Sequence, residues 1–225
     1  MEGHDRSLDS TQKLINIFQP DFFLRQENWL FAFEHFKFSQ VHNEYTGSGI
    51  SVDSDNPRFI SRNEKAKWGL DTLFKHSMNS NVSTLPEFSN HRIQVIKLSL
   101  EVPIIIVNVY LPSSSLPESD YDESLSLLST IIATYAVDAA ILLAGDWNAS
   151  LYRGTKRDKK FQSFCQADGL IPAIGTDSTP SYHGYNGSVS KIDYVLAHRD
   201  SFEANGVRIE DVKVVKQICK ENAHA

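Results

Sequence analysis

Two stretches in the middle of the chain predict the fold most directly. Residues 103–112 read Pro-Ile-Ile-Ile-Val-Asn-Val-Tyr-Leu-Pro, and residues 139–148 read Ala-Ala-Ile-Leu-Leu-Ala-Gly-Asp-Trp-Asn. The β-branched run at 103–110 is typical of a strand buried on both faces, and residues 139–144 predict a second such strand. Between them, residues 121–135 place apolar side chains on one helical face. Strand, helix and strand in this order indicate a layered α/β domain.

Shorter segments on either side add further elements. Helical spacing predicts a helix over residues 8–18, ended by Pro20, and another over residues 158–167, closed by Gly169. Further strands are expected at residues 21–25, 68–74, 92–100, 192–197 and 207–215. Because 225 residues are enough for one sizeable core and too few to promise two domains of ordinary size, we expect one domain over residues 1–225.

Composition limits the classes of function. The chain has 225 residues, 41% of them hydrophobic, and a formal charge of −6. This charge argues against a protein that coats nucleic acid by bulk electrostatics, but it is compatible with a nuclease whose metal site needs acidic groups. Two distant cysteines, Cys165 and Cys219, build neither a disulfide framework nor a zinc site. With no signal peptide and no membrane-spanning segment, we expect an intracellular protein of the nucleus or cytoplasm that is not secreted.

The string Gly145-Asp146-Trp147-Asn148 carries the first chemical signal. It directly follows the buried strand, and α/β folds place ligands at the carboxyl ends of strands. Asp146 can orient or deprotonate a water, and Asn148 can donate to a phosphate oxygen. A plain Gly-Asp turn is the alternative.

Two more acidic residues stand at strand ends. Asp193 interrupts the start of the apolar strand in Ser190-Lys191-Ile192-Asp193-Tyr194-Val195-Leu196, and it would either hold a histidine ring or face water at a sheet edge. Glu27 follows the short apolar segment at 21–25, where a carboxylate suits a hard cation such as Mg²⁺. A solvated glutamate is the alternative for Glu27.

These three strings, in this order, resemble the endonuclease/exonuclease/phosphatase superfamily, the deoxyribonuclease-I-like fold. Asn108-Val109-Tyr110-Leu111-Pro112 is similar to the strand of that family that ends in a phosphate-contacting tyrosine, and residues 68–73 are similar to its early sheet. Pro180-Ser181-Tyr182-His183, ahead of Asp193, most resembles the endonucleases of non-long-terminal-repeat retrotransposons. The resemblance covers roughly residues 14–215.

The resemblance implies a four-layered α/β sandwich of two mostly antiparallel mixed sheets flanked by helices. It implies Mg²⁺, with Mn²⁺ as a possible substitute, as the cofactor. It implies that Glu27 is a metal ligand and that Tyr110 contacts the phosphate. Asp146 would be the base or water-orienting acid, with Asn148 as its partner, and Asp193 would be the carboxylate behind a catalytic histidine. Ser181 and Asn108 would bind substrate.

A basic run follows the acidic motif. Residues 153–160 read Arg-Gly-Thr-Lys-Arg-Asp-Lys-Lys, from which Arg153, Lys156 and Arg157 could grip the phosphates that flank a scissile bond. A solvated loop and helix start is the alternative.

The sequence departs from the family at both ends. Residues 1–10 offer no apolar strand for the family's first asparagine, and no Ser-Asp-His string is present near the C-terminus. His224 is at most a degenerate version of the missing histidine. We therefore expect a truncated domain that cleaves DNA slowly or not at all.

The leading hypothesis is a magnesium-dependent phosphodiester hydrolase, a reverse-transcriptase-associated DNA endonuclease domain of retrotransposon type. One alternative is a phosphatase or phosphodiesterase of small phosphate esters, and another is a catalytically dead remnant that binds nucleic acid. We expect DNA as the partner, no membrane association and a monomer.

Overall fold

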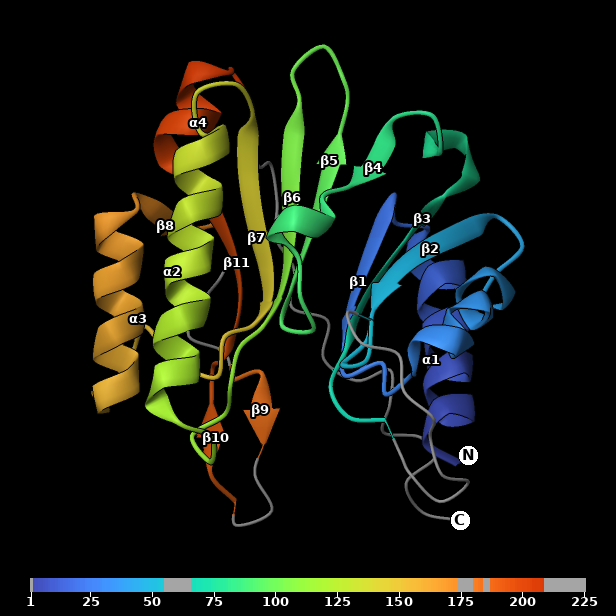
Figure 1. Ribbon diagram of the computed structural model, residues 1–225, viewed down its shortest axis with the longest axis horizontal. Coiled ribbons are helices and arrows are strands. Elements are labelled where there is room, and N and C mark those ends of the chain that lie inside the picture. The colour runs from blue at the N-terminus through green and yellow to red at the C-terminus, as the bar shows by residue number, and fades with distance from the viewer. Residues whose placement is uncertain (1, 55–65, 174–179, 184–186, 209–225) are drawn as a thin grey trace.

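The computed structural model describes residues 2–54, 66–173, 180–183 and 187–208, with helix α1 without its side chains up to residue 7 (Figure 1). Two sheets carry the fold. The larger has six strands in the order β4-β5-β6-β7-β11-β8. Their bounds are β4 Val82–Thr84, β5 Ile93–Leu98, β6 Ile104–Tyr110, β7 Ala140–Asp146, β11 Asp193–His198 and β8 Leu170–Pro172. Of the strand pairs in the described residues, only β6 and β7 are parallel, and α2 (Glu118–Tyr135) makes the crossover that parallel neighbours need.

The smaller sheet has three antiparallel strands in the order β1-β3-β2. They are β1 (Phe22–Gln26), β3 (Leu70–Lys75) and β2 (Tyr45–Ile50), and a 3₁₀ segment, η1 (Ala32–Gln40), packs against β2. Helix α1 (Glu2–Phe18) covers the outer face of this sheet (Figure 1). Its core joins Ile15 of α1 to Leu73 of β3.

The two sheets face each other, and helices lie outside both of them (Figure 1). Helices α2 and α3 (Lys156–Ala167) cover the outer face of the six-stranded sheet, where the main apolar core is built around fully buried Trp147. The expected four-layered α/β sandwich is therefore confirmed. Its mixed character resides in the larger sheet alone, because the smaller sheet is wholly antiparallel.

The remaining described elements are short: η2 (His76–Met78), η3 (Pro86–Phe88), β9 (Tyr182–His183), β10 (Val189–Ser190) and α4 (Arg199–Ala204). None of the described helices has the length and apolar character needed to cross a membrane.

Several element boundaries differ from the sequence prediction. The strand expected over 68–74 begins at Leu70, because Trp68 and Gly69 have φ values of 61° and 89°. The helix expected over 158–167 begins at Lys156, because Thr155 caps it by accepting a hydrogen bond from the backbone of Asp158. The helix expected over 8–18 already begins at Glu2, so the segment before Ser10 does not form the family's first strand.

Two predicted elements differ further. The strand expected over 92–100 spans only Ile93–Leu98. Of the segment at 207–215, only residues 207 and 208 are described, and they are not in a strand. His224 lies outside the described residues.

Candidate active site

Three polar side chains stand in one row across the larger sheet. Tyr110 pairs with Asp146 across β6 and β7, and Asp146 pairs with Asp193 across β7 and β11. Directly paired residues point to the same face of a sheet, and neighbouring strands lie about 4.8 Å apart. The row faces the smaller sheet, because the Tyr110 hydroxyl donates a hydrogen bond to Glu27, which follows β1.

Glu27 arrives at this row in an uncommon backbone conformation. Its φ of 57° turns the chain sharply after β1, and its side chain is exposed apart from the contact with Tyr110. Non-glycine residues rarely adopt such φ values, and those that do cluster at functional sites. The turn brings a carboxylate of the small sheet against the row of the large sheet.

Gly145 and Asn148 shape the turn that presents Asp146. Gly145 has a φ of 142°, and a Cβ atom there would lie 2.0 Å from the carbonyl oxygen of Val109, so no other residue fits. Asn148, with a φ of 48°, donates its backbone N–H to Asp146 Oδ1 over 2.8 Å. Its side-chain amide donates to Asp146 Oδ2 over 3.3 Å and to the Leu111 carbonyl over 2.8 Å.

Asn148 therefore fixes the carboxylate of Asp146. Both amide hydrogens of Asn148 are engaged, so the expected donation to a phosphate oxygen would first have to displace the longer of these bonds.

Burial and like charge set the protonation of the row. Desolvation, together with the carboxylates of Asp193 and Glu27, raises the pKa of Asp146 to about 7, against the opposing backbone hydrogen bond from Asn148. Desolvation also raises the pKa of Asp193, opposed by the Ser181 hydroxyl. The pKa of Tyr110 is raised by burial and by its hydrogen bond to Glu27, so its phenol stays neutral and able to donate at physiological pH.

Ser181 lies next to this row, as expected, but its contacts are structural. Its hydroxyl accepts the backbone N–H groups of Ile192 and Asp193, both over 3.1 Å, and its own N–H donates to Ser190. Ser181 thus ties β9 and β10 to the start of β11. This tie places Asp193 in the row.

The prediction that Asn108 binds substrate is wrong. Asn108 is fully buried between the sheets, where its amide donates to the carbonyls of Arg25 and Asp71 over 3.1 Å each. Its oxygen accepts from Gln26 Nε2 over 2.7 Å. Every polar atom of the side chain is satisfied within the protein, so Asn108 holds the end of β1, and with it Glu27, against β6.

Two arginines of the basic run are held by contacts within the protein, and the prediction that Arg157 grips a phosphate is wrong. Arg157 is 5% exposed, donates to Glu118 and to the Pro112 carbonyl, and lies 4.7 Å above the Tyr121 ring. Arg153 forms an ion pair of 2.9 Å with buried Asp158. Both arginines thus tie the start of α3 to its surroundings.

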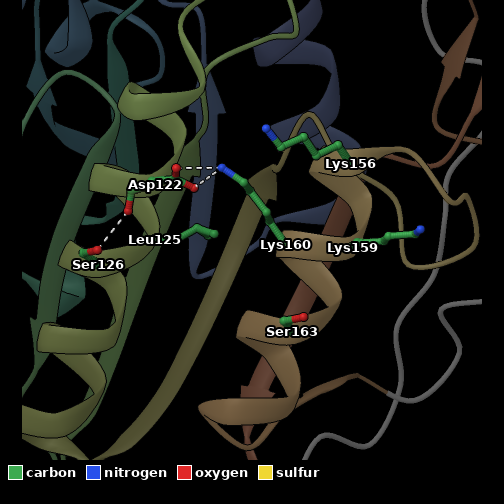
Figure 2. Close-up of a pocket in the computed structure, with 7 residues that line it drawn as sticks. All are labelled: Asp122, Leu125, Ser126, Lys156, Lys159, Lys160 and Ser163. Carbon is green, nitrogen blue, oxygen red and sulfur yellow. Dashed lines mark hydrogen bonds and ion pairs between the residues drawn. The ribbon is translucent and has the colours of Figure 1, made fainter.

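Lys156 lies elsewhere on the surface. It lines a hollow between α2 and α3 with Lys159, Lys160 and Asp122, and no member of the acidic row lines this hollow (Figure 2). Lys160 is bonded to Asp122, and Lys156 extends towards the same side of α3, whereas Lys159 points away from that pair (Figure 2).

Arg92 is a site residue that the sequence prediction missed. Its guanidinium lies 4.5 Å from the centre of the Trp68 ring and 5.1 Å from that of the Tyr110 ring, and it is 7% exposed. Burial lowers its pKa, while nearby Tyr110 and Glu27 favour its charge. A basic residue before a strand gives no sequence signal for this role, because the role depends on Trp68 and Tyr110, which are far apart in the sequence.

The donor set fits a hard cation only partly. Glu27, Asp146 and Asp193 supply oxygen atoms alone, which is the chemistry that Mg²⁺ and Mn²⁺ accept. Yet among the described residues no three histidine, cysteine or carboxylate side chains lie close enough to enclose a metal ion. Mg²⁺ tolerates such a site, because it keeps several of its waters.

The fold and the acidic row together define the class of protein: a deoxyribonuclease-I-like α/β sandwich with a carboxylate cluster at its strand ends. In its fold, the chain resembles the endonuclease/exonuclease/phosphatase superfamily. Residues 104–214 match the sequence family described as "Endonuclease-reverse transcriptase". No curated protein sequence matches the chain.

Solved structures share this fold at low sequence identity. The endonuclease domain of TRAS1, a telomere-specific non-LTR retrotransposon, aligns with a TM-score of 0.63 and 14% identity over 85% of this chain and 78% of that one. AP endonuclease LMAP from Leishmania major gives 0.63 and 15%, over 87% and 75%. The 3′ phosphatase NExo from Neisseria, bound to product DNA hairpin, gives 0.60 and 15%, over 84% and 80%.

Proposed function

We propose that this chain is a metal-dependent phosphodiester hydrolase that acts on DNA as an endonuclease domain of retrotransposon type. The observation that carries the proposal is the meeting of Glu27, Tyr110, Asp146, Asn148 and Asp193, from four separate segments, at one end of the paired sheets. A single carboxylate at a strand end is common on a protein surface, but the convergence of three has no structural explanation. It costs free energy, because it brings like charges together.

Asp146 is the general base in this proposal. With a pKa of about 7 it exists in both forms near neutral pH, which suits a group that takes a proton from water. Asn148 fixes both oxygens of the carboxylate, so the accepted proton has a defined direction. Tyr110 has a neutral hydroxyl that can donate to a phosphate oxygen once it leaves Glu27.

Glu27 would hold Mg²⁺ or Mn²⁺, with waters completing the shell. When bound, the metal ion offsets charge on the phosphate and on the leaving oxygen. Asp193 orients a histidine in this proposal, and the segment expected to supply that histidine lies outside the described residues. Slow cleavage therefore stays a prediction.

The choice of DNA rests on the neighbours. The matched family is named for an endonuclease coupled to reverse transcriptase, and TRAS1 is named as a retrotransposon endonuclease. The resemblance to a 3′ phosphatase supports hydrolysis of terminal or small phosphate esters as the second candidate.

Nicking of supercoiled plasmid by the purified chain tests the proposal. We expect nicking in Mg²⁺ or Mn²⁺, none in EDTA, and a loss of about 100-fold or more in Asp146→Asn. Asp138→Asn, a change in the exposed turn before β7, serves as the control and should nick like the parent. Hydrolysis of small phosphate esters without nicking would favour the second candidate, whereas DNA binding without any hydrolysis would identify a catalytically dead remnant.

A further inference from the structure

The segment that follows Glu27 holds a strained backbone next to the acidic row. Trp29 has a φ of 53°, and Trp68, whose carbonyl accepts the Trp29 N–H over 3.1 Å, has a φ of 61°. Left-handed backbone is uncommon in non-glycine residues and persists only where the surroundings enforce it. Here two such residues, both tryptophans, face each other across one hydrogen bond.

Asn28 shows what enforces this conformation. It is 9% exposed, and its amide donates to the Leu70 carbonyl over 2.9 Å while its oxygen accepts the Leu30 N–H over 3.1 Å. A Cβ atom on Gly69 would lie 2.4 Å from that oxygen, so the two segments interlock closely. The loop that carries Trp29 is therefore a fixed support.

This rigid support presents an exposed indole. Trp29 is 53% exposed, although tryptophan is among the residues that gain most from burial. It is separated by one residue from Glu27, so its backbone lies within roughly 7 Å of the candidate metal ligand.

The opposite segment is aromatic as well. The Trp68 ring stacks on His91 at 5.5 Å and 27°, and Arg92 lies between Trp68 and Tyr110. The side chains of Tyr110, Arg92, Trp68 and His91 thus form one aromatic and cationic stack. It extends from the candidate phosphate-binding tyrosine to Trp68, whose backbone holds that of Trp29.

We propose that Trp29 stacks on an unpaired nucleobase beside the phosphodiester held at Glu27 and Asp146, and so selects nucleic acid over small phosphate esters. This inference rests on the proposed function and names its substrate class. A protein of formal charge −6 gains little from attraction to the phosphate backbone, so nucleic-acid affinity needs a contribution that is independent of charge. Base–aromatic stacking supplies one, since every nucleobase has a π-face. A small ester without a base cannot use it.

Binding of a fluorescein-labelled single-stranded oligothymidylate, followed by anisotropy in EDTA, tests the inference without requiring catalysis. We expect Trp29→Ala to weaken binding about 5- to 150-fold, the range for loss of one stacked base. Trp29→Phe should recover most of the affinity, because it keeps an aromatic ring. Phe18→Ala removes an aromatic of similar exposure, 50%, from the end of α1 and should bind as the parent does.

Equal binding by Trp29→Ala and the parent would overturn the inference, as would an equal loss in Phe18→Ala or no binding by the parent chain. Urea midpoints of all variants separate a lost contact from a lost fold. The plasmid assay distinguishes the two proposals. Nicking abolished in Asp146→Asn, together with unchanged oligothymidylate binding in Trp29→Ala, would leave the proposed function standing and remove this inference alone.

Discussion

The carboxyl group of Asp146 is held where its charged form is disfavoured. Burial removes this carboxyl group from water, and the negative charges of Asp193 and Glu27 also disfavour its ionisation. A carboxyl whose pKa is higher in the folded than in the unfolded chain binds more protons when folded, so folding loses stability as the pH rises from about 4 to 7. At the residue scale, the chemistry proposed for this site is therefore obtained at a cost in stability.

Replacing this carboxylate should stabilise the metal-free protein at alkaline pH. Asp146→Asn cannot ionise, so its advantage should be on the order of 2 kcal/mol at pH 8.5 and should shrink towards pH 5. Urea unfolding in EDTA at both pH values measures the difference. Asp138→Asn, in the exposed turn before β7, should show no comparable pH-dependent gain. An Asp146→Asn advantage that grows as the pH falls would contradict the sign of the pKa shift.

Asn108 offers a second test at this scale. In Asn108→Leu the side chain keeps a similar size, but Gln26 and the carbonyls of Arg25 and Asp71 lose their partners inside the protein. We expect a loss of about 3 kcal/mol or more in the free energy of unfolding.

Asn16→Leu is the control for this change, because it removes a single exposed hydrogen bond to His42 and should cost under about 0.5 kcal/mol. Similar urea midpoints for the two variants would show that Asn108 does not join the sheets.

At the scale of elements, the contact between β6 and β7 decides where the site can form. These parallel strands bring Tyr110 level with Asp146, and β11 adds Asp193 to the same row. The close approach of the two backbones depends on Gly145, which lies against the Val109 carbonyl. The register of β6, β7 and β11 therefore decides which polar side chains meet at the site.

Gly145→Ala should separate this strand pair. The added methyl group would meet backbone at 2.0 Å, and the φ of 142° is one that alanine strongly disfavours. We expect a loss of about 2–4 kcal/mol in the free energy of unfolding.

Gly154→Ala is the matched control, because a methyl group added there would have no atom within 4 Å and the φ of Gly154 is not positive. It should change stability by under about 0.5 kcal/mol. Equal urea midpoints for the two alanine variants would show that the approach at Gly145 is not required.

At the scale of the whole molecule, the candidate site bridges the two sheets. Glu27 follows the small sheet, whereas Tyr110 and Asp146 stand on the large one. A ligand that bridges them binds the folded state alone and must stabilise the entire domain by mass action. Metal binding and global stability are therefore linked.

Calorimetric titration should show weak Mg²⁺ binding, with a Kd of about 1 mM or weaker, because most of the ligand shell is water. The melting temperature should rise with Mg²⁺ in the parent chain and in Glu101→Gln, a change at the opposite end of β6. The rise should be lost in Glu27→Gln. Tight binding that survives Glu27→Gln would place the metal elsewhere.

Local pattern determined a large part of this protein. The β-branched run and the Gly-Asp-x-Asn string identified β6, β7 and the place of Asp146, because strand burial and tight turns depend on residues that are close in sequence. The alternation of strands and helices predicted a layered α/β fold, and the family resemblance carried by the acidic strings predicted the residues that meet at Asp146.

Only the tertiary structure decided which polar residues face the site and which serve the framework. Asn108 and Arg157 match sequence patterns of substrate contacts, yet both are satisfied inside the protein, by β1 and by α2. Strand β2 has two glycines in its six residues and carries little strand pattern. Its place depends on a tertiary contact, because Gly49 leaves the space that the Phe38 ring occupies. The exposure of Trp29 likewise depends on Asn28, Gly69 and Trp68. Such contacts join segments far apart in the chain, and no local periodicity encodes them.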